Sequence, residues 1–532
     1  MSAPYKSVGD LLDAHRRRTP QKAAIVDVER DAALDFAALA DIVDALARQL
    51  QRRDVRSGSR VVIAGGEGID KLLLWLALWH LGAVVCPIDV TFTGAMHTMH
   101  VFDLLMPDLV LLPADMDAAL VPASAAPLIR FGTWPPDDDN AGAQLHFRAD
   151  LADRSDPLPR VGTPGRADTL ASMCCTSGTT GLPKVVVYDH ASYWYNGLDS
   201  IELLALTPDD RTLEYRSFDW YSAQILSLMP FLQLGSTLCI ARHFSRSRFA
   251  EWIARHRVTV SAGIPTVINM LLEAPIDVSR GELATLRAMT CSTAPLSNVQ
   301  WSRFEAKYGI RVLNLYGSSE TGWICGNHFD RRKFGTVGFP PAHIALSIVD
   351  PNGSPCAVGE TGQVVVDGEK LAIGLLTAQH VIAPIRGAPF ATRDIATRDD
   401  DGFVVVSGRM DDLIIRGGVK IQPNEIEDVL LAYPGVREVA AIGVPDPIYG
   451  HEPVCFVVPR DERAATVVGA ERAALAMELT KWCCAYLPQE KQPKLIQLTP
   501  ALPRNERGKV MRDTLRREWW MLTHAVQQQT PR

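Results

Sequence analysis

The chain has 532 residues, a length that suggests more than one folded domain. Its 47% hydrophobic and 22% charged residues are values of a globular protein, which excludes wholesale disorder and a fibrous structure. With 54 Lys and Arg against 61 Asp and Glu, the formal net charge is −7, so no global electrostatic attraction to nucleic acid or to an anionic membrane is expected.

The N-terminus and the cysteines both predict a cytoplasmic protein. The first residues, MSAPYKSVGDLLDAHRRR, contain no apolar segment of the kind found in signal peptides. The most membrane-like stretch, residues 72–88, contains His80, Gly82 and Pro87, so we predict a core helix that runs into a strand. The ten cysteines form no CxxC pair, and most lie in apolar runs, which is typical of buried thiols in a reducing compartment.

The predicted elements alternate between strands and helices. The segments are a strand with its turn (59–68), a helix (69–83), a strand (84–89), a strand (236–241), a helix (248–256) and a strand (258–262). This alternation predicts an α/β fold with largely buried sheets.

Two segments are predicted to connect folded units. Residues 135–168 are rich in Asp, Pro, Gly and Arg, which is typical of a surface loop or linker. Near residues 409–412 a strand-like VVV run gives way to charged residues, and about a domain's length of chain follows. We therefore predict two domains, residues 1–410 and 411–532.

The strongest local signal is the sequence TSGTTGLPK at residues 176–184. Glycines and hydroxyl residues offer closely spaced N–H and O–H donors, and the lysine adds a charge, so the segment predicts a phosphate-binding loop. The residues concerned are Thr176, Ser177, Gly178, Thr179, Thr180, Gly181 and Lys184. It is not a Walker A loop, because Val185 follows the lysine and a strand rather than a helix follows the loop. A plain glycine-rich hairpin is the alternative.

Eight further motifs follow in order along the chain. They are GIPT (263–266), STAPLS (292–297), NLYGSSETG (314–322), TRDIA (392–396), GRMDDLI (408–414), GGVKIQPNEIE (417–427), GVPDPIYG (443–450) and LPRNERGKVMR (502–512). Together with the loop, this series resembles the adenylate-forming superfamily of acyl-CoA synthetases, peptide-synthetase adenylation domains and beetle luciferases. The resemblance implies a large N-terminal domain of stacked α/β subdomains and a small, mobile α+β C-terminal domain.

The resemblance also implies a two-step reaction. The carboxylate of an acid attacks the α-phosphate of ATP, and a thiol then displaces AMP. The implied nucleotide-site residues are Tyr316 against adenine, Thr293, Ala294 and Pro295 along the purine, Glu320 as a ligand of Mg²⁺, Thr321 at the α-phosphate, and Asp394 and Arg409 at the ribose. Without the resemblance, Asp394 and Arg409 would be interpreted as solvated loop charges.

Three positions of the predicted C-terminal domain take roles from the resemblance. Lys509 corresponds to a catalytic lysine, whose cation would bridge the substrate carboxylate and the α-phosphate. Asp411 corresponds to a hinge, at which the small domain would rotate between the two half-reactions. Gly417 and Gly418 correspond to a loop beside a thiol tunnel, and a plain turn is the alternative.

One position departs from the family pattern. The family usually has glycine directly after the loop lysine, where this chain has Val185. A β-branched residue favours an extended backbone there, so we expect Val185 to affect how the loop handles pyrophosphate.

The segment SFDWYSA, residues 217–223, aligns with the family segment beside the acyl pocket. Asp219 stands where aryl-acid ligases have His and amino-acid adenylation domains have Asp, so it holds a substrate ammonium or caps the next helix. The pocket residues implied are Asp219, Trp220, Tyr221, Gly263, Cys291 and Trp323. Aromatic walls suit a small or medium acid better than a long chain, although core packing would also explain them.

The sequence therefore predicts an ATP- and Mg²⁺-dependent acid–thiol ligase that joins a small carboxylic acid to CoA, without nucleic acid or membrane insertion. One alternative is a stand-alone adenylation enzyme that loads an amino or aryl acid onto a phosphopantetheine carrier protein. Another is a nucleotide-binding regulatory module without catalysis. The presence of Lys184, Glu320, Asp394 and Lys509 argues against the second alternative.

Overall fold

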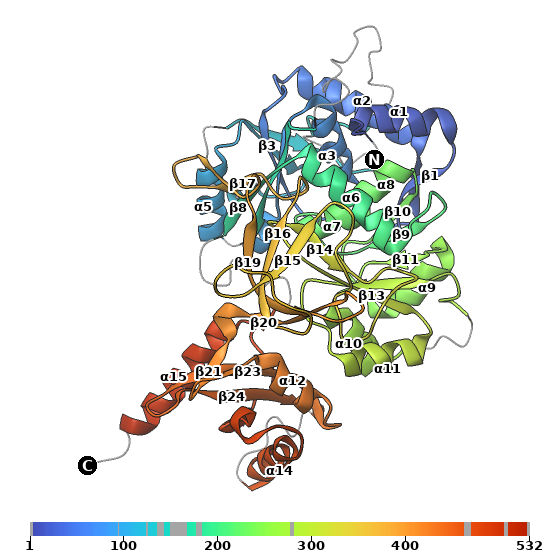
Figure 1. The fold of residues 1–532 in the computed structure, drawn as a ribbon. Coiled ribbons are helices and arrows are strands. Elements are labelled where there is room, and N and C mark those ends of the chain that lie inside the picture. Colours follow the sequence, from blue (N-terminus) through green and yellow to red (C-terminus); the bar gives the residue numbers. More distant parts are fainter. Residues whose placement is uncertain are drawn as a thin grey trace.

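The computed structural model describes residues 4–93, 95–123, 126–135, 143–148, 167–176, 183–276, 281–461, 470–504 and 509–528. Within these residues the strands form four sheets, three in a large N-terminal domain and one in a small C-terminal domain (Figure 1). Most of the predicted linker 135–168 and residues 177–182 of the predicted phosphate loop lie outside the described residues.

The first sheet has eight strands and is mostly parallel, with antiparallel pairs at its two edges. In spatial order they are β14 (Gly322–Gly326), β13 (Arg311–Ser318), β12 (Ala288–Cys291), β11 (Val260–Ser261), β9 (Arg211–Glu214), β10 (Thr237–Ile240), β1 (Ala23–Asp27) and β2 (Ala32–Asp35). The predicted strands 236–241 and 258–262 correspond to β10 and β11, so both are confirmed.

The second sheet also has eight strands in the described part. In spatial order they are β18 (Ile382–Pro384), β17 (Gly374–Leu376), β8 (Lys184–Asp189), β7 (Leu170–Thr176), β4 (Val84–Ile88), β3 (Arg60–Ala64), β5 (Leu109–Pro113) and β6 (Leu128–Phe131). Its parallel half, from β7 to β6, contains the strands predicted at 59–68 and 84–89.

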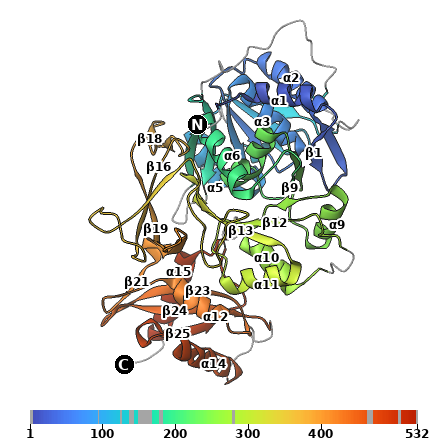
Figure 2. The same ribbon diagram turned by 45° about the vertical axis from the view of Figure 1, so that its right-hand side comes forward.

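Helices fill the space between the two large sheets (Figure 2). α3 (Ile69–Leu81) contacts β3 and β4, and α6 (His190–Leu204) contacts β8 of one sheet and β14 of the other. α3 is largely apolar, as suits a helix buried between layers, and it ends at Gly82 in the left-handed conformation. The membrane-like stretch 72–88 is therefore core helix and strand, and no helix of the described part is long and apolar enough to cross a membrane.

The remaining helices of this domain divide between the central layer, where they share a core with α3 and α6, and the outer faces of the two sheets. They are α1 (Val8–Arg18), α2 (Phe36–Gln51), α4 (Val90–Thr93), α5 (Ala95–Leu105), α7 (Tyr221–Ala223), a π-helix (Gln224–Leu228), α8 (Met229–Leu234), α9 (Arg246–His256), α10 (Pro265–Glu273) and α11 (Asn298–Tyr308). α9 confirms the helix that was predicted at residues 248–256.

A third, antiparallel sheet links the large domain to the small one. Its strands are β15 (Ala345–Val349), β16 (Gly362–Asp367), β19 (Phe390–Arg398) and β20 (Val404–Arg409). The chain then passes through a short turn, Met410–Asp412, into the fourth sheet. The predicted boundary between residues 410 and 411 falls within this turn.

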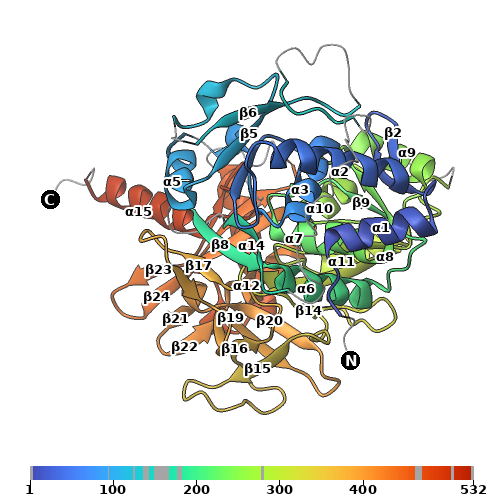
Figure 3. The ribbon, with the colours of Figure 1, turned by 90° about the horizontal axis from the view of Figure 1, so that it is seen from above.

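The C-terminal domain is an α+β unit around one mixed sheet (Figures 1 and 3). Its elements are β21 (Ile414–Arg416), β22 (Val419–Ile421), α12 (Pro423–Leu431), β23 (Val436–Asp446), β24 (Gly450–Pro459), α14 (Ala470–Tyr486), β25 (Leu495–Leu498) and α15 (Arg512–Gln528). The predicted α/β fold with a small C-terminal domain is confirmed.

Candidate active site

Three of the predicted nucleotide residues converge from three strands. The hydroxyl of Tyr316, on β13, donates a 2.6 Å hydrogen bond to Oδ2 of Asp394, on β19. Arg409, on β20, lies directly opposite Asp394 in the strand register, and its Nε is 3.9 Å from Oδ1. Burial and the charge of Asp394 raise the pKa of Tyr316, so the phenol stays a donor. Two sheets therefore bring an aromatic ring, a carboxylate and a guanidinium together.

The predicted metal and α-phosphate residues lie in the tight turn between β13 and β14. Thr321 is buried, accepts a 3.2 Å hydrogen bond from the N–H of Ser318 and donates to the carbonyl of Gly322. At Gly317 a side chain would meet the carbonyl of Gly322 at 2.0 Å, so the close turn requires glycine. Glu320 is half-buried in the same turn.

Glu320 fits Mg²⁺ as one ligand among several rather than as a member of a protein cage. Among the described residues no group of three or more His, Cys, Asp or Glu side chains could hold a metal ion. Mg²⁺ usually binds to one or two carboxylates plus substrate phosphates, which a single carboxylate at Glu320 can satisfy. When bound, the ion would neutralise charge on the phosphate oxygens.

The predicted purine wall contains an unusual backbone conformation. Thr293 has φ of 74°, a left-handed conformation that costs a non-glycine residue about 1–3 kcal/mol. Thr293 and Pro295 are exposed, and Ala294 is half-buried between them. Such strain persists where the surrounding structure holds it, and it occurs often at ligand sites.

Both ends of the predicted phosphate loop lie on paired strands. Thr176 ends β7 and faces Lys184, the first residue of β8, in the antiparallel register. Ser177, Gly178, Thr179, Thr180 and Gly181 lie outside the described residues, so the cradle itself stays a prediction. Val185 is fully buried in β8, where its β-branched side chain packs in the sheet core. The extended backbone expected there is confirmed.

Lys509 lies within electrostatic range of the residues predicted to bind ribose. Its pKa is lowered, first by burial and then by Arg409, whereas Asp412 and Asp394 act in the opposite direction. An ammonium held in this way is poorly solvated, so an anionic ligand beside it would stabilise its charge.

The segments on either side of Lys509 also approach the large domain. Arg504 and Met511 line the same pocket as Cys175 and Thr176, at the end of β7. The C-terminal domain therefore brings Arg504 and Met511, on either side of Lys509, to the strand that precedes the phosphate loop.

Asp411 and Asp412 lie between the two domains and pair in opposite directions. Asp411 accepts a 2.7 Å hydrogen bond from Nε of Arg393, on β19 of the large domain. Asp412 accepts a 2.9 Å hydrogen bond from Arg516, on α15 of the small domain. Asp411 is thus located where a hinge is predicted, and the rotation itself stays a prediction.

Gly417 and Gly418 form the turn between β21 and β22. Their φ angles are 55° and 88°, the conformation that a two-residue hairpin turn of type I′ requires. Neither glycine belongs to the described lining of the pocket that Arg504 and Met511 share. The turn accounts for both glycines, and a role beside a thiol stays a prediction.

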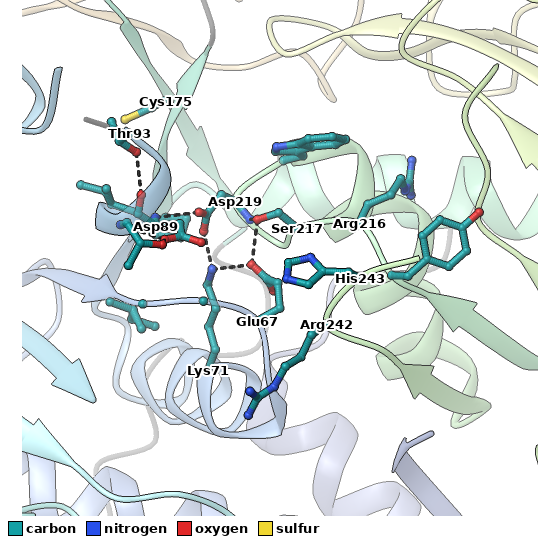
Figure 4. A pocket seen from close by; sticks show the side chains of 18 of the residues that line it. Glu67, Lys71, Asp89, Thr93, Cys175, Arg216, Ser217, Asp219, Arg242 and His243 are labelled. Carbon is teal, nitrogen blue, oxygen red and sulfur yellow. Dashed lines mark hydrogen bonds and ion pairs between the residues drawn. The ribbon is translucent and has the colours of Figure 1, made fainter. Parts of the chain in front are cut away.

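A large pocket of about 1380 Å³ lies where the parallel strands of the two eight-stranded sheets end (Figure 4). Carboxyl ends of parallel strands are the usual ligand sites of α/β folds. The described lining includes residues 65–67, 87–89, 215–217 and 242–244, with Asp219 and Trp220, and from the C-terminal domain Met511 and, on α15, Asp513 and Arg517.

Asp219 is held at the pocket wall by Lys71 rather than at a helix end. Its Oδ1 accepts a 2.5 Å hydrogen bond from Nζ of Lys71, and its Oδ2 accepts one of 2.9 Å from the N–H of Asp89. The capping alternative is wrong, because Trp220 precedes α7 and no side chain caps that helix. The ammonium that Asp219 binds here therefore belongs to the protein.

The other predicted acid-pocket residues divide into two groups. Trp220 lines the pocket, whereas Tyr221 and Trp323 are buried behind it. Tyr221 stacks on Tyr188 with ring centroids 4.0 Å apart, and Trp323 donates a 2.8 Å hydrogen bond to Ser200. Packing explains both aromatic residues, so their contact with an acid stays a prediction.

Gly263 and Cys291 lie behind the same wall, outside the described lining. Cys291 is fully buried in β12. A side chain at Gly263 would meet the carbonyl of Thr290 at 2.1 Å, so close backbone packing requires glycine there. Their contact with an acid likewise stays a prediction.

Comparison with known proteins identifies the family. The sequence profile of AMP-binding enzymes matches residues 12–376, and that of the AMP-binding enzyme C-terminal domain matches residues 425–509. The chain belongs to the AMP-binding enzyme family.

Relatives of this AMP-binding enzyme are similar along their whole length. It is 31% identical to the sulfoacetate–CoA ligase of Cupriavidus necator, over 96% of this chain and 97% of the relative. It is 29% identical to a feruloyl-CoA synthase of an Amycolatopsis species, over 92% and 94%. The ATP-bound MatB structure from Rhodopseudomonas palustris aligns with a TM-score of 0.83 at 25% identity, over 96% of this chain and 99% of MatB.

These relationships establish the reaction class. The protein is an AMP-forming acid–thiol ligase, which activates a carboxylic acid with ATP and transfers the acyl group to CoA. CoA ligation is favoured over the loading of a carrier protein.

The sequence interpretation of this ligase missed a buried ionic network around Lys71. Lys71 is 2% exposed and contacts both Glu67, at 2.7 Å, and Asp219. Although burial acts against it, these two carboxylates raise the pKa of Lys71, so the cation is retained. The signal was the lysine near the start of the largely apolar segment IDKLLLWLALWHL, because a charge buried in such a helix needs a partner.

A second buried pair was missed beside the network. Arg216 binds both carboxylate oxygens of Glu214, at 2.9 and 2.7 Å, and donates to Ser292. Arg216 also lines the pocket, but its charge is already neutralised by Glu214. It therefore contributes shape and hydrogen bonds to the wall rather than a free cation.

Proposed function

We propose that this ligase activates a small or medium-sized carboxylic acid and that Lys509, Asp394 and Tyr316 serve the first half-reaction. In that step a carboxylate oxygen forms a bond to the α-phosphorus of ATP, and the bond to pyrophosphate breaks. Tyr316 would contact adenine, and Asp394 would accept hydrogen bonds from ribose hydroxyls. Lys509 would lie between the carboxylate and the α-phosphate, where negative charge increases in the transition state.

The arrangement of the two domains supports this proposal. Arg504 and Met511 line a pocket of the large domain, and Lys509 between them is influenced by the charges of Asp394 and Arg409. A cation brought to the ribose site from another domain suits adenylate formation, since that step adds charge to phosphate oxygens. This proximity is the observation on which the proposal rests.

The second half-reaction needs a different arrangement. We propose that rotation near Asp411 moves Lys509 away and brings Gly417 and Gly418 toward the acyl-adenylate. The sulfur of CoA then forms a bond to the acyl carbon, and the bond to AMP breaks. The glycine turn offers no side chain at Gly418, where no atom lies within 4 Å of the Cβ position, so a slender thiol arm could pass.

The acid is proposed by size class. Trp220 and the strand ends form a wide, partly apolar pocket, which suits small or medium acids. The acids named for the relatives, sulfoacetate and ferulate, fall within that class.

Pyrophosphate exchange against a panel of aryl, aliphatic and amino acids tests the proposal. We expect exchange with at least one small or medium acid and thioester formation when CoA is added. Exchange with long-chain acids alone would contradict the size class. Transfer to a holo-carrier protein but not to CoA would contradict the choice of thiol.

A further inference from the structure

Only one of the two carboxylate oxygens of Glu67 accepts hydrogen bonds from the described residues. Its Oε1 accepts hydrogen bonds of 2.7 Å from Nζ of Lys71 and 2.7 Å from Oγ of Ser217. Its Oε2 is buried and has no hydrogen-bond partner among the described residues. The side chain is 9% exposed and lines the large pocket, where Figure 4 shows it between Lys71 and Ser217. A buried, charged acceptor without a donor is costly, so a site of this kind calls for a ligand.

Charge in the network selects the kind of ligand. Glu67 and Asp219 share the single ammonium of Lys71, so the three side chains together carry one net negative charge. The guanidinium of Arg216 is committed to Glu214, while Arg242 and His243 lie exposed at the rim. The buried end of the pocket therefore favours a hydrogen-bond donor over a second anion.

The pocket also points to one of the three substrates, which are ATP, the acid and CoA. Asp219 and Trp220, which the sequence associates with the acid, line it together with Glu67. Gly417 and Gly418, which the sequence associates with the thiol, are not in its described lining. Thr176, at the end of β7, lines the pocket as well, but Glu67 and Asp219 bind the same lysine, so we assign the ligand group nearest Glu67 to the acid rather than to ATP.

We propose that Glu67 is a specificity-determining residue whose Oε2 accepts a hydrogen bond from a hydroxyl or amino group of the acid substrate. Lys71 and Ser217 hold the carboxylate in place by its other oxygen. The preferred acids carry an O–H or N–H donor away from the reacting carboxylate, and acids with a second carboxylate or a sulfonate at that position bind poorly. This inference rests on the proposed function.

The test compares pairs of acids of equal size. In each pair one member has a hydroxyl or amino group, and the other has a methyl group at the same ring position, as in 3-hydroxybenzoate and 3-methylbenzoate. Pyrophosphate exchange gives kcat/KM for each member in wild type and in Glu67→Gln. The glutamine keeps its carbonyl for Lys71 and Ser217 but replaces the free acceptor with a donor. We expect the preference for the hydroxyl or amino acid to fall by about tenfold to hundredfold.

Glu282→Gln is the matched control. Glu282 also has a buried Oε2 without a partner among the described residues, but it lies outside the pocket lining. We expect this variant to keep the wild-type preference. A thermal denaturation curve for each variant shows that the protein is folded, and Glu67→Asp, which withdraws the acceptor by one methylene, serves if the glutamine variant does not fold.

An unchanged acid preference in folded Glu67→Gln or Glu67→Asp would overturn the inference. So would an effect confined to the KM of CoA, measured separately as thioester formation, because it would assign Oε2 to the thiol instead. Failure of the proposed function looks different, because wild type would then show no exchange with any small or medium acid.

Discussion

The phenol of Tyr316 holds one oxygen of Asp394 through a 2.6 Å hydrogen bond, although the two residues are 78 positions apart in the sequence. The other oxygen of Asp394 faces Arg409 at 3.9 Å. A carboxylate fixed in this way presents its lone pairs in a set direction, which is what a pair of ribose hydroxyls needs.

Tyr316→Phe keeps the ring and removes only the hydroxyl that orients Asp394. We expect the KM for ATP in pyrophosphate exchange to rise about threefold to tenfold, the effect of losing one hydrogen bond to a charged group that can still meet solvent. Tyr433→Phe is the control, since Tyr433 makes a similar bond to Glu478 on the exposed surface of the C-terminal domain. If both variants changed the KM for ATP equally, the hydrogen bond of Tyr316 would have no specific role in nucleotide binding.

Lys509→Ala should separate the two half-reactions. Adenylation should fall by at least about a hundredfold, because an oriented cation at developing charge contributes about 3 kcal/mol or more. Thioester formation from a preformed acyl-adenylate should be nearly unaffected. The first is measured by pyrophosphate exchange, and the second by release of AMP on adding CoA. Equal loss of both activities would contradict a lysine that acts in one domain arrangement only.

The lowered pKa of Lys509 gives a pH dependence. Only the protonated side chain can bridge two anions, and burial together with Arg409 lowers its pKa. The adenylation rate should therefore decline on the alkaline side earlier than an ordinary lysine would require. Lys509→Arg stays charged throughout, so its lower rate should show no such decline. If the adenylation rate of Lys509→Arg still declined at alkaline pH, that decline would arise from the titration of another group.

Lys71→Met should destabilise the N-terminal domain. Methionine fits the apolar surroundings of α3, but Glu67 and Asp219 would then be left without their shared cation. We expect the free energy of unfolding to fall by about 3–5 kcal/mol, measured by urea denaturation. Lys333→Met is the control, because Lys333 pairs with Asp399 and Asp401 on the surface and should matter little. A neutral effect of Lys71→Met would show that the network is not buried in solution.

Asp70 should make stability depend on pH in the direction opposite to a salt-bridged acid. Burial raises its pKa to about 6, against the hydrogen bond from the N–H of Trp134. The stabilisation from its protonated form is present below about pH 4 and is lost as the pH rises through about 6. Asp70→Asn can still accept the Trp134 hydrogen bond but needs no proton. The stability of Asp70→Asn minus that of wild type should therefore be about 2 kcal/mol larger at pH 7.5 than at pH 4. Parallel stability curves of the two proteins would contradict a raised pKa.

Local pattern was enough to predict the elements that frame the site. The apolar run of α3 between two short β-branched strands, and the order of the motifs, predicted β3, α3 and β4. The motifs also predicted that Tyr316, Asp394 and Arg409 would meet, because each is fixed by a recurrent segment.

Long-range pairing was not predictable from the sequence. Lys71 and Asp219 are 148 positions apart, and no local pattern relates them. The direction of Tyr221 and Trp323 depends on which neighbours fill the core, so an aromatic residue near the pocket could be predicted but its exposure could not. The π-helix Gln224–Leu228 after Tyr221 could not be predicted for the same reason, since a wider helical turn depends on tertiary packing.

The adjacent residues Asp411 and Asp412 are tied to different domains, one to Arg393 and the other to Arg516. A rotation of the backbone between Asp411 and Asp412 would therefore leave each ion pair intact within its own domain, so the two pairs confine the pivot to these two residues. Because the Arg393–Asp411 pair is solvent-exposed, added salt weakens it. At high ionic strength the predicted pivot would then be less sharply confined on the side of the large domain.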